Sequence, residues 1–159
     1  MKKDKLLYRI QFSICIVIAG LAISGLTAFP LETELRWLIS YSNNYPEMMS
    51  KWFNKIYSAI TKTNETYPWL SYGTDWLAFA HLMLALLFIG PLKDPVKNVW
   101  VIEFGMIACL LVIPLAVIAG SIRDIPVFWR IIDCSFGAIG IIPLLVCYRS
   151  INQLKHVAV

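Results

Sequence analysis

The sequence predicts an all-α integral membrane protein, a bundle of four transmembrane helices with amphipathic helices in the first loop outside the membrane. Two observations lead to this fold class. Of the 159 residues, 58% are hydrophobic and 15% are charged, whereas a soluble domain usually has about 25% charged residues. The apolar residues also gather into four runs, and about 18 mostly apolar residues can cross the ~30 Å hydrocarbon layer as a helix. The predicted spans are residues 10–29, 72–90, 99–120 and about 128–148.

The first run follows a basic segment, residues 1–5, as the apolar core of a secretory signal peptide would. The run is too long for such a core, and no small-x-small cleavage site is followed by a soluble domain. We therefore predict a helix that is retained in the protein. A chain of this length favours one domain, so residues 1–159 are predicted to form a single membrane domain.

Basic residues predict which side of the membrane each loop occupies. They are denser in the two tails and in the loop between the second and third spans: Lys2, Lys3, Lys5, Arg9, Lys93, Lys97, Arg149 and Lys155. The other side has fewer over a longer stretch: Arg36, Lys51, Lys55, Lys62, Arg123 and Arg130. Because cytoplasmic loops are richer in lysine and arginine, both termini are predicted to be cytoplasmic, in a protein of the cytoplasmic (inner) membrane. These charges lie at helix ends, so the net charge of +4 does not indicate a nucleic-acid partner.

The outer segment, residues 30–71, is the longest polar stretch, and its spacing predicts helices. Apolar residues recur every four positions: Met48, Trp52, Ile56 and Ile60. This pattern is typical of an amphipathic helix, with Pro46 near its first turn, and a shorter helix is predicted from Glu32 to Ser40. Most of the tryptophans fall on this side, where indole rings favour the membrane interface. The helices are predicted to cap the mouth of the bundle; the alternative is that they lie flat in the interface.

Small and polar side chains at helical spacing predict the faces through which the spans pack, because helices in lipid associate by close packing and hydrogen bonds. The predicted stripes are Ser13, Val17, Gly20, Ser24 and Thr27 in the first span; Thr74, Ala78, His81 and Ala85 in the second; Gly105, Ala108, Cys109, Val112, Ala116 and Ala119 in the third; and Arg130, Asp133, Gly137 and Gly140 in the fourth. A packing seam is the simplest interpretation of the small residues.

Ionisable residues gather at the outer ends of the second and fourth spans: Asp75, Arg123, Asp124, Arg130 and Asp133. A charge at bilayer depth costs ~2.5–3.5 kcal/mol, so partners are expected. Arg130 and Asp133 are three residues apart on a helix and can pair. Asp75 could then meet Arg123 or Arg130 across the bundle. The cluster is interpreted either as salt bridges that pin the two spans together or as a polar pocket that opens outward.

Two further ionisable residues lie deeper in the spans. His81, near the middle of the second span, is interpreted either as a hydrogen-bonded core residue or as a proton donor or ligand contact in a pocket. The only other histidine, His156, is in the tail, so a bis-histidine haem is not predicted. The cysteine spacing indicates no metal site, and we predict neither a metal nor a cofactor. Glu103 is predicted to reach towards Lys97 or Lys93, with a path shared with His81 as the alternative.

The residues leave two classes of function open. The first is an outward-facing polar pocket for a lipid or another small amphipathic molecule, with the candidate residues His81, Asp75, Arg130, Asp133, Arg123, Glu103, Trp76 and Trp129. Such a pocket would be catalytic if His81 shuttled a proton, so whether the chain is an enzyme stays open. The alternative is an accessory or assembly subunit whose outer loop docks a larger membrane complex or a second copy of the chain. A closed cap would favour the pocket, whereas exposed Trp37 and Trp52 would favour docking.

Overall fold

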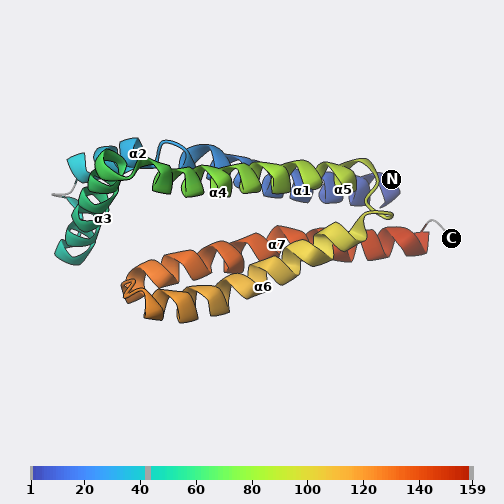
Figure 1. Cartoon of the computed structure of the whole chain (residues 1–159). Coiled ribbons are helices and arrows are strands. Elements are labelled where there is room, and N and C mark those ends of the chain that lie inside the picture. Colours follow the sequence, from blue (N-terminus) through green and yellow to red (C-terminus); the bar gives the residue numbers. More distant parts are fainter. Residues whose placement is uncertain (1, 42–43, 158–159) are drawn as a thin grey trace. The chain divides into compact units, whose positions relative to one another are not determined.

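The computed structural model describes residues 2–41 and 44–157, and the regular elements in these ranges are helices (Figure 1). In chain order they are α1 (Lys2–Ala28), α2 (Leu31–Ser40), α3 (Glu47–Thr66), α4 (Pro68–Leu87), α5 (Ile89–Lys93), α6 (Val99–Ile122) and α7 (Val127–Val157). Met1, residues 42–43 of the predicted outer segment and residues 158–159 at the C-terminal end lie outside the described residues.

In the part of the chain that the structure describes, four stretches are long and apolar enough to cross a membrane: Lys3–Ala28, Pro68–Lys93, Val99–Ile122 and Val127–His156. They confirm the all-helical class with four candidate spans. The first and last helices run beyond the predicted spans at 10–29 and 128–148. In α7 the extension ends with Lys155 and His156 in the last turn, where cationic side chains interact favourably with the helix dipole. Helical structure therefore continues past the point at which the apolar run stops.

The chain forms two compact units. The first unit comprises Met1–Gly20 and Ala85–Val159, and the second comprises Leu21–Leu84. In the first unit, α6 and α7 form an antiparallel pair joined by a short turn (Figure 1). Later positions of α6 contact earlier positions of α7, as expected for antiparallel helices: Gly105 with Leu144, Cys109 with Gly137, and Gly120 with Arg130.

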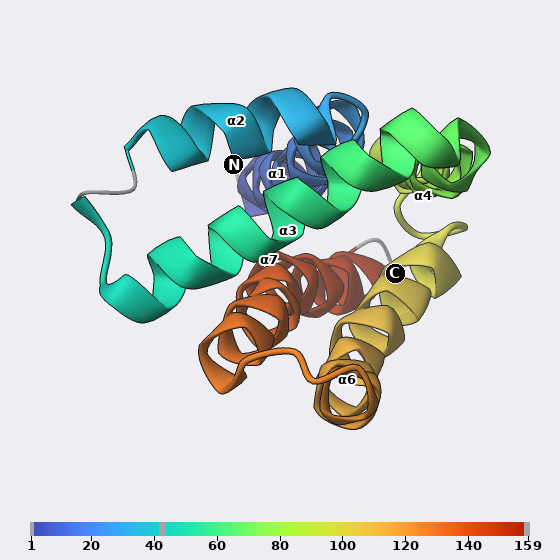
Figure 2. The same cartoon turned by 60° about the vertical axis from the view of Figure 1, so that its left-hand side comes forward.

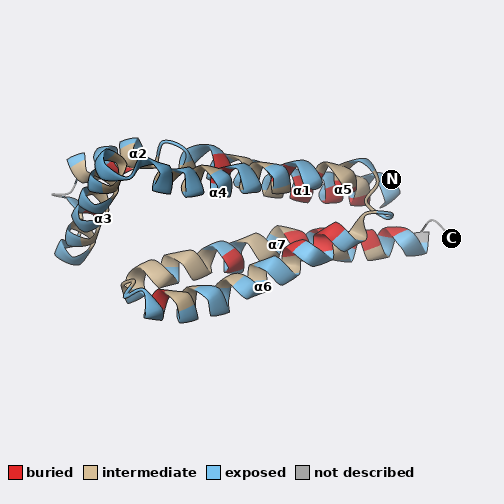
Figure 3. Ribbon diagram, viewed as in Figure 1, coloured by how far each residue is buried: buried red, intermediate tan, exposed pale blue. Residues whose placement is uncertain are grey.

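The helices α6 and α7 approach each other closely at Gly137, which belongs to the predicted stripe of the fourth span. A Cβ atom placed on Gly137 would overlap the main-chain carbonyl oxygen of Cys109. Such contacts between small residues and a neighbouring backbone are typical of helices that pack in lipid. The largest fully buried side chains of this unit come from several helices (Figure 3): Ile10, Ile14, Pro91, Val101, Ile102, Cys147 and Ile151. In α6 and α7 the buried positions gather near the start of α6 and the second half of α7 (Figure 3).

In the second unit, α2 and α3 lie side by side and antiparallel (Figure 2). Leu35 of α2 and Phe53 of α3 are buried, and the ring of Tyr45 meets Phe53 edge-on at 5.5 Å between centroids. The helix α3 starts directly after Pro46, whose fixed φ suits the entry to a helix. The side-chain hydrogen bonds that Glu32 of α2 accepts from α3 join the two helices.

The end of α1 packs against α4 within the second unit. A Cβ atom on Gly25 would lie 2.8 Å from the carbonyl oxygen of Ala78, so glycine is needed for this approach. Ala78 is fully buried, as its place on the predicted stripe requires. The prediction for the first span is wrong in this part of α1, because Ser24 and Thr27 are exposed and Gly25 makes the contact. Gly25 is adjacent to Ser24 in sequence but faces a different side of the helix.

Candidate functional site

A cavity of about 460 Å³ lies in the second unit, where the turn after α1, the start of α2, the C-terminal half of α3 and the start of α4 come together. One part of its lining is apolar: Phe29, Pro30, Leu31, Ala59, Ile60 and Leu70. The other part is polar and comprises Glu32, Thr33, Thr63, Asn64, Ser71, Thr74 and Asp75, of which Glu32 and Asp75 are carboxylates. The cavity therefore offers both hydrogen-bonding groups and an apolar wall within one unit of the chain.

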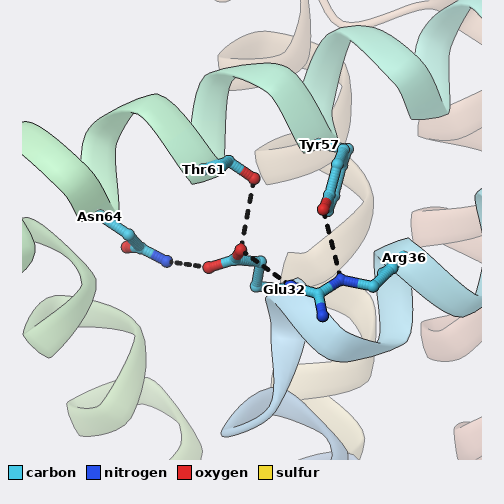
Figure 4. Close-up of polar contacts among 5 residues, drawn as sticks. All are labelled: Glu32, Arg36, Tyr57, Thr61 and Asn64. Atoms are coloured by element: carbon cyan, nitrogen blue, oxygen red, sulfur yellow. Dashed lines mark hydrogen bonds and ion pairs between the residues drawn. The ribbon is translucent and has the colours of Figure 1, made fainter.

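Glu32 makes the largest number of polar contacts in this region (Figure 4). The hydroxyl of Thr61 donates to its Oε1 at 3.3 Å, and the side-chain amide of Asn64 donates to its Oε2 at 2.7 Å. Arg36 Nη2 lies 3.5 Å from Oε1, one helical turn further along α2. Hydrogen bonds to an ionised acceptor are about twice as strong as neutral ones. The Glu32 carboxylate therefore ties the first turn of α2 to the last turns of α3.

The local sequence explains why Glu32 is placed there. Pro30 precedes α2, and its carbonyl oxygen accepts a hydrogen bond from the main-chain N–H of Glu34 at 2.9 Å. Glu32 then stands in the first turn of α2, where the partial positive charge of the helix N-terminus favours a carboxylate. Because α2 runs antiparallel to α3, this first turn lies opposite the C-terminal turns of α3, which carry Thr61 and Asn64 (Figure 4).

Arg36 is mostly exposed and does not line the cavity. Its Nε donates a hydrogen bond to the hydroxyl oxygen of Tyr57 on α3 at 3.3 Å (Figure 4). This contact with Tyr57, followed by the nearby Glu32 carboxylate, raises the pKa of Arg36 above its ordinary value. Arg36 is thus a permanent cation that faces Glu32 from outside the cavity.

A second set of contacts joins α3 to α4 beside the cavity. The hydroxyl of Ser71 donates to the side-chain oxygen of Asn64. Thr74 in turn donates from Oγ1 to the main-chain carbonyl of Ser71 at 2.6 Å. Asn64 is therefore held from both ends, since its amide nitrogen bonds Glu32 and its amide oxygen bonds Ser71. Its orientation is fixed by these two neighbours.

Asp75 is the one predicted site residue that lines the cavity. It lies one helical turn after Ser71 on α4 and is half-buried. Within the described part of the chain, its carboxylate has neither a hydrogen-bond partner nor an ion-pair partner, in contrast to Glu32. The cavity therefore has one carboxylate whose oxygens are already occupied and one whose oxygens are available.

Trp76 and His81 share α4 with Asp75 but do not line the cavity. Trp76 is exposed, and its ring meets Tyr72 and Phe79 edge-on. His81 is half-buried, and its Nδ1 lies 2.8 Å from the carbonyl oxygen of Leu77 on the preceding turn. Because a carbonyl only accepts, Nδ1 carries the hydrogen in this contact. The contact uses one ring nitrogen and lies within α4, so both interpretations of His81, a core residue or a ligand contact, stay predictions.

The predicted ion pair between Arg130 and Asp133 is not formed in the first unit. Arg130 Nη1 instead donates to the hydroxyl of Ser121 at 2.6 Å. Gly120 allows this arrangement, because the aliphatic part of the Arg130 side chain lies where a Cβ of residue 120 would be. The side chain therefore turns back towards the end of α6, away from the next turn of its own helix. Arg123, also part of the predicted cluster, is exposed directly after the last residue of α6.

Glu103 and Trp129 also belong to the first unit. Glu103 is exposed, and among the described residues it forms no ion pair with Lys97 or Lys93, so its predicted reach towards these lysines stays a prediction. Lys97 pairs with Asp94 at 3.5 Å instead, three residues before it in the same turn. Trp129 is half-buried, and its ring meets Phe128 edge-on.

The predicted site residues thus divide between the two units. Asp75, Trp76 and His81 are in the second, and the rest are in the first, so the predicted outer cluster across the bundle stays a prediction. Among residues 2–41 and 44–157, no group of three or more histidine, cysteine or acidic side chains is arranged to hold a metal ion. Comparison with known proteins finds no family model, no curated protein and no solved structure that matches this chain.

Proposed function

We propose that this chain is an integral protein of the cytoplasmic membrane and that its cavity binds a lipid or another small amphipathic molecule at the outer face. The observation that carries the proposal is the lining of the cavity, which joins an apolar wall to a polar one. Pockets for small molecules usually measure about 300–1,000 Å³ and combine apolar walls with a few placed polar groups. The cavity, at about 460 Å³, is of this size.

The topology supports an outer position for this site. The cavity lies at the end of α1 and the start of α4, which the density of basic residues assigns to the non-cytoplasmic side. In the proposal, α2 and α3 are the amphipathic helices of the outer loop and cover the ends of the spans beside the cavity. A molecule with an apolar tail would enter from the bilayer and present its polar end to Glu32, Asn64 and Asp75.

Native mass spectrometry of the protein, extracted gently from its own membrane, tests the proposal. We expect an added mass of a few hundred daltons, because a drug-sized or lipid-like molecule fills a pocket of this size. The variant Ala59→Trp should lose the added mass, because Ala59 lines the cavity and a tryptophan side chain would fill it. The matched control is Ala80→Trp, at an exposed position of α4 outside the cavity, which should keep it. An added mass that is absent, or that both variants retain, would contradict the proposed site.

Cysteine labelling in intact cells tests the orientation. A cysteine at Glu65, an exposed position near the end of α3, should react with a membrane-impermeant maleimide from outside. A cysteine at Gln153, an exposed position of α7 on the cytoplasmic side, should react only after lysis. Labelling in the reverse order would invert the topology, and with it the face on which the cavity opens.

Docking of a membrane partner is the second candidate, and one observation favours it. Trp37 of α2 is 62% exposed, and its ring meets Tyr41 edge-on at 5.1 Å between centroids. Exposed tryptophan and tyrosine side chains often carry the binding energy of protein interfaces. Trp52, by contrast, is half-buried. In the same mass spectra, a stoichiometric protein partner that Trp37→Ala removes, with no small-molecule mass, would replace the pocket by this second function.

A further inference from the structure

We infer that the cavity of the second unit selects a cationic amphiphile, a molecule that carries a protonated amine at one end and a short apolar tail at the other. This inference rests on the proposed function, because it names the class of ligand for the same cavity. It depends on the charge of the lining, on the difference between the two carboxylates, and on the position of the apolar wall.

The charge of the lining has one sign. Glu32 and Asp75 are the titratable residues that line the cavity, and none of its described lining residues is lysine, arginine or histidine. A phosphate or carboxylate head group would meet two negative charges and no cation inside the cavity. A protonated amine would meet carboxylates alone among the charged lining groups, and its interaction with a carboxylate is stronger near apolar walls than in bulk water because the effective dielectric constant is lower.

The two carboxylates differ in their partners, and this difference indicates which of them binds the ligand. Both oxygens of Glu32 accept hydrogen bonds from α3, and Arg36 already balances its charge from outside. Asp75 has no such partner in the described part of the chain and is half-buried. A charge in this situation gains most from an added cation. Asp75 is therefore the residue that we assign to the ammonium group of the ligand.

The polar neighbours of Asp75 complete a place for an amine. An ammonium group has three N–H donors, so it needs more acceptors than one carboxylate supplies. The hydroxyl oxygens of Ser71 and Thr74 lie on the same helix face within one turn of Asp75, and both line the cavity. Each hydroxyl already donates its hydrogen, Ser71 to Asn64 and Thr74 to a main-chain carbonyl. Their oxygens are thus left as acceptors, which suits a donor-rich head group.

The apolar wall accounts for the tail. Phe29 and Leu31 at the α1–α2 turn, Ile60 of α3 and Leu70 of α4 contribute the larger apolar side chains of the lining. Burial of apolar surface contributes about 25 cal/mol per Å². A short alkyl chain that packs against these apolar side chains therefore adds affinity, while the amine stays near Asp75.

Three probes with the same alkyl chain test the inference on the full-length protein in nanodiscs of zwitterionic lipid. They are octylamine, octanol and octanoate, which differ in the charge of the head group at neutral pH. Isothermal titration calorimetry should show saturable binding of octylamine and binding weaker by about tenfold or more for octanol and octanoate, because only the amine gains the ion pair with Asp75. Subtracting a titration into empty nanodiscs removes partitioning into lipid.

Variants separate the ligand class from the pocket itself. Asp75→Asn, nearly equal in shape, should weaken octylamine by about tenfold and octanol much less, because an amide oxygen still accepts a hydrogen bond from a hydroxyl. Glu65→Gln, at an acidic residue outside the cavity, should change neither. Equal binding of the three probes, all blocked by Ala59→Trp, would overturn the cationic class and keep the pocket. Octylamine binding that survives Ala59→Trp would overturn the pocket as well. Absence of saturable octylamine binding, or unchanged binding in Asp75→Asn, would overturn the assignment of the amine to Asp75.

Discussion

Replacing Gly137 by alanine is expected to destabilise the protein by about 1–3 kcal/mol or more. The added Cβ would overlap the main-chain carbonyl oxygen of Cys109, and a backbone atom cannot move aside as the end of a flexible side chain can. The α6–α7 pair would have to separate along its length, which weakens packing on both sides of the contact. Thermal unfolding of the detergent-solubilised protein, followed by circular dichroism, should show a clearly lowered Tm.

Alanine substitutions at two other glycines are controls that should lower the Tm less than Gly137→Ala or not at all. Gly73→Ala should leave the Tm unchanged or raise it slightly, because a Cβ there meets no atom within 4 Å and alanine is the better helix former. Gly120→Ala should have an intermediate effect, since its Cβ would meet the flexible Arg130 side chain. A Gly137→Ala variant as stable as Gly73→Ala would mean that α6 and α7 do not pack as described.

Replacing Glu32 by alanine is expected to loosen α2 from α3 and to cost about 1–3 kcal/mol. The change leaves the donors of Thr61 and Asn64 without their shared acceptor in a part-buried place. Arg36 also loses its ion pair with Glu32, although its bond to Tyr57 remains. Hydrogen exchange followed by mass spectrometry should show faster exchange in peptides of both α2 and the C-terminal half of α3.

The acidic neighbour Glu34 offers a matched control on the same helix, because its side chain does not line the cavity. Glu34→Ala should leave the exchange of α3 unchanged. Glu32→Gln should lie between wild type and Glu32→Ala, since an amide oxygen can still accept one of the two hydrogen bonds. Equal exchange in Glu32→Ala and Glu34→Ala would show that the Glu32 contacts do not hold the two helices together.

Much of the fold follows from local properties of the chain. The length and hydropathy of the four runs predict four candidate spans. Each residue contributes its own cost of exposing apolar surface to water, so the total for a run can be read from the sequence alone. Helical spacing also identifies packing positions such as Ala78 and Gly137, since their faces are fixed by the period of the helix. The contact made by Gly25 is not predicted, because Ser24 and Thr27 also form a stripe of small and polar residues at helical spacing, on another face of α1.

The site was predicted only in part, because it depends on which helices meet. Asp75 was identified as an ionisable residue inside a span, whereas Glu32 and Asn64 were not identified. One signal was present: Asn64 continues the four-residue spacing that runs through Ile56 and Ile60, so a polar residue falls on the apolar face of α3. A polar residue on such a face requires a polar partner, and Glu32 is that partner.

The predicted Arg130–Asp133 pair shows the limit of spacing rules. Residues three apart on a helix can pair, but a long arginine side chain also reaches other acceptors. The missing side chain of Gly120 gives Arg130 room to lie back along α6 and bond Ser121. Because that room is created by a residue ten positions away, spacing within α7 alone could not predict the outcome.

Only Tyr67 separates the last residue of α3 from the first residue of α4. The main-chain N–H of Tyr67 still bonds the carbonyl of Thr63 at 2.6 Å, and Ser71 bonds Asn64 across the junction. Because these bonds span the junction, we expect α3 to move with α4 as one rigid body. With 20 residues, α3 is about 30 Å long, and a tilt of α4 by about 5° would displace the far end of α3 by ~3 Å. Movement of a candidate membrane-spanning helix would thereby be converted into sideways travel of the tip of α3.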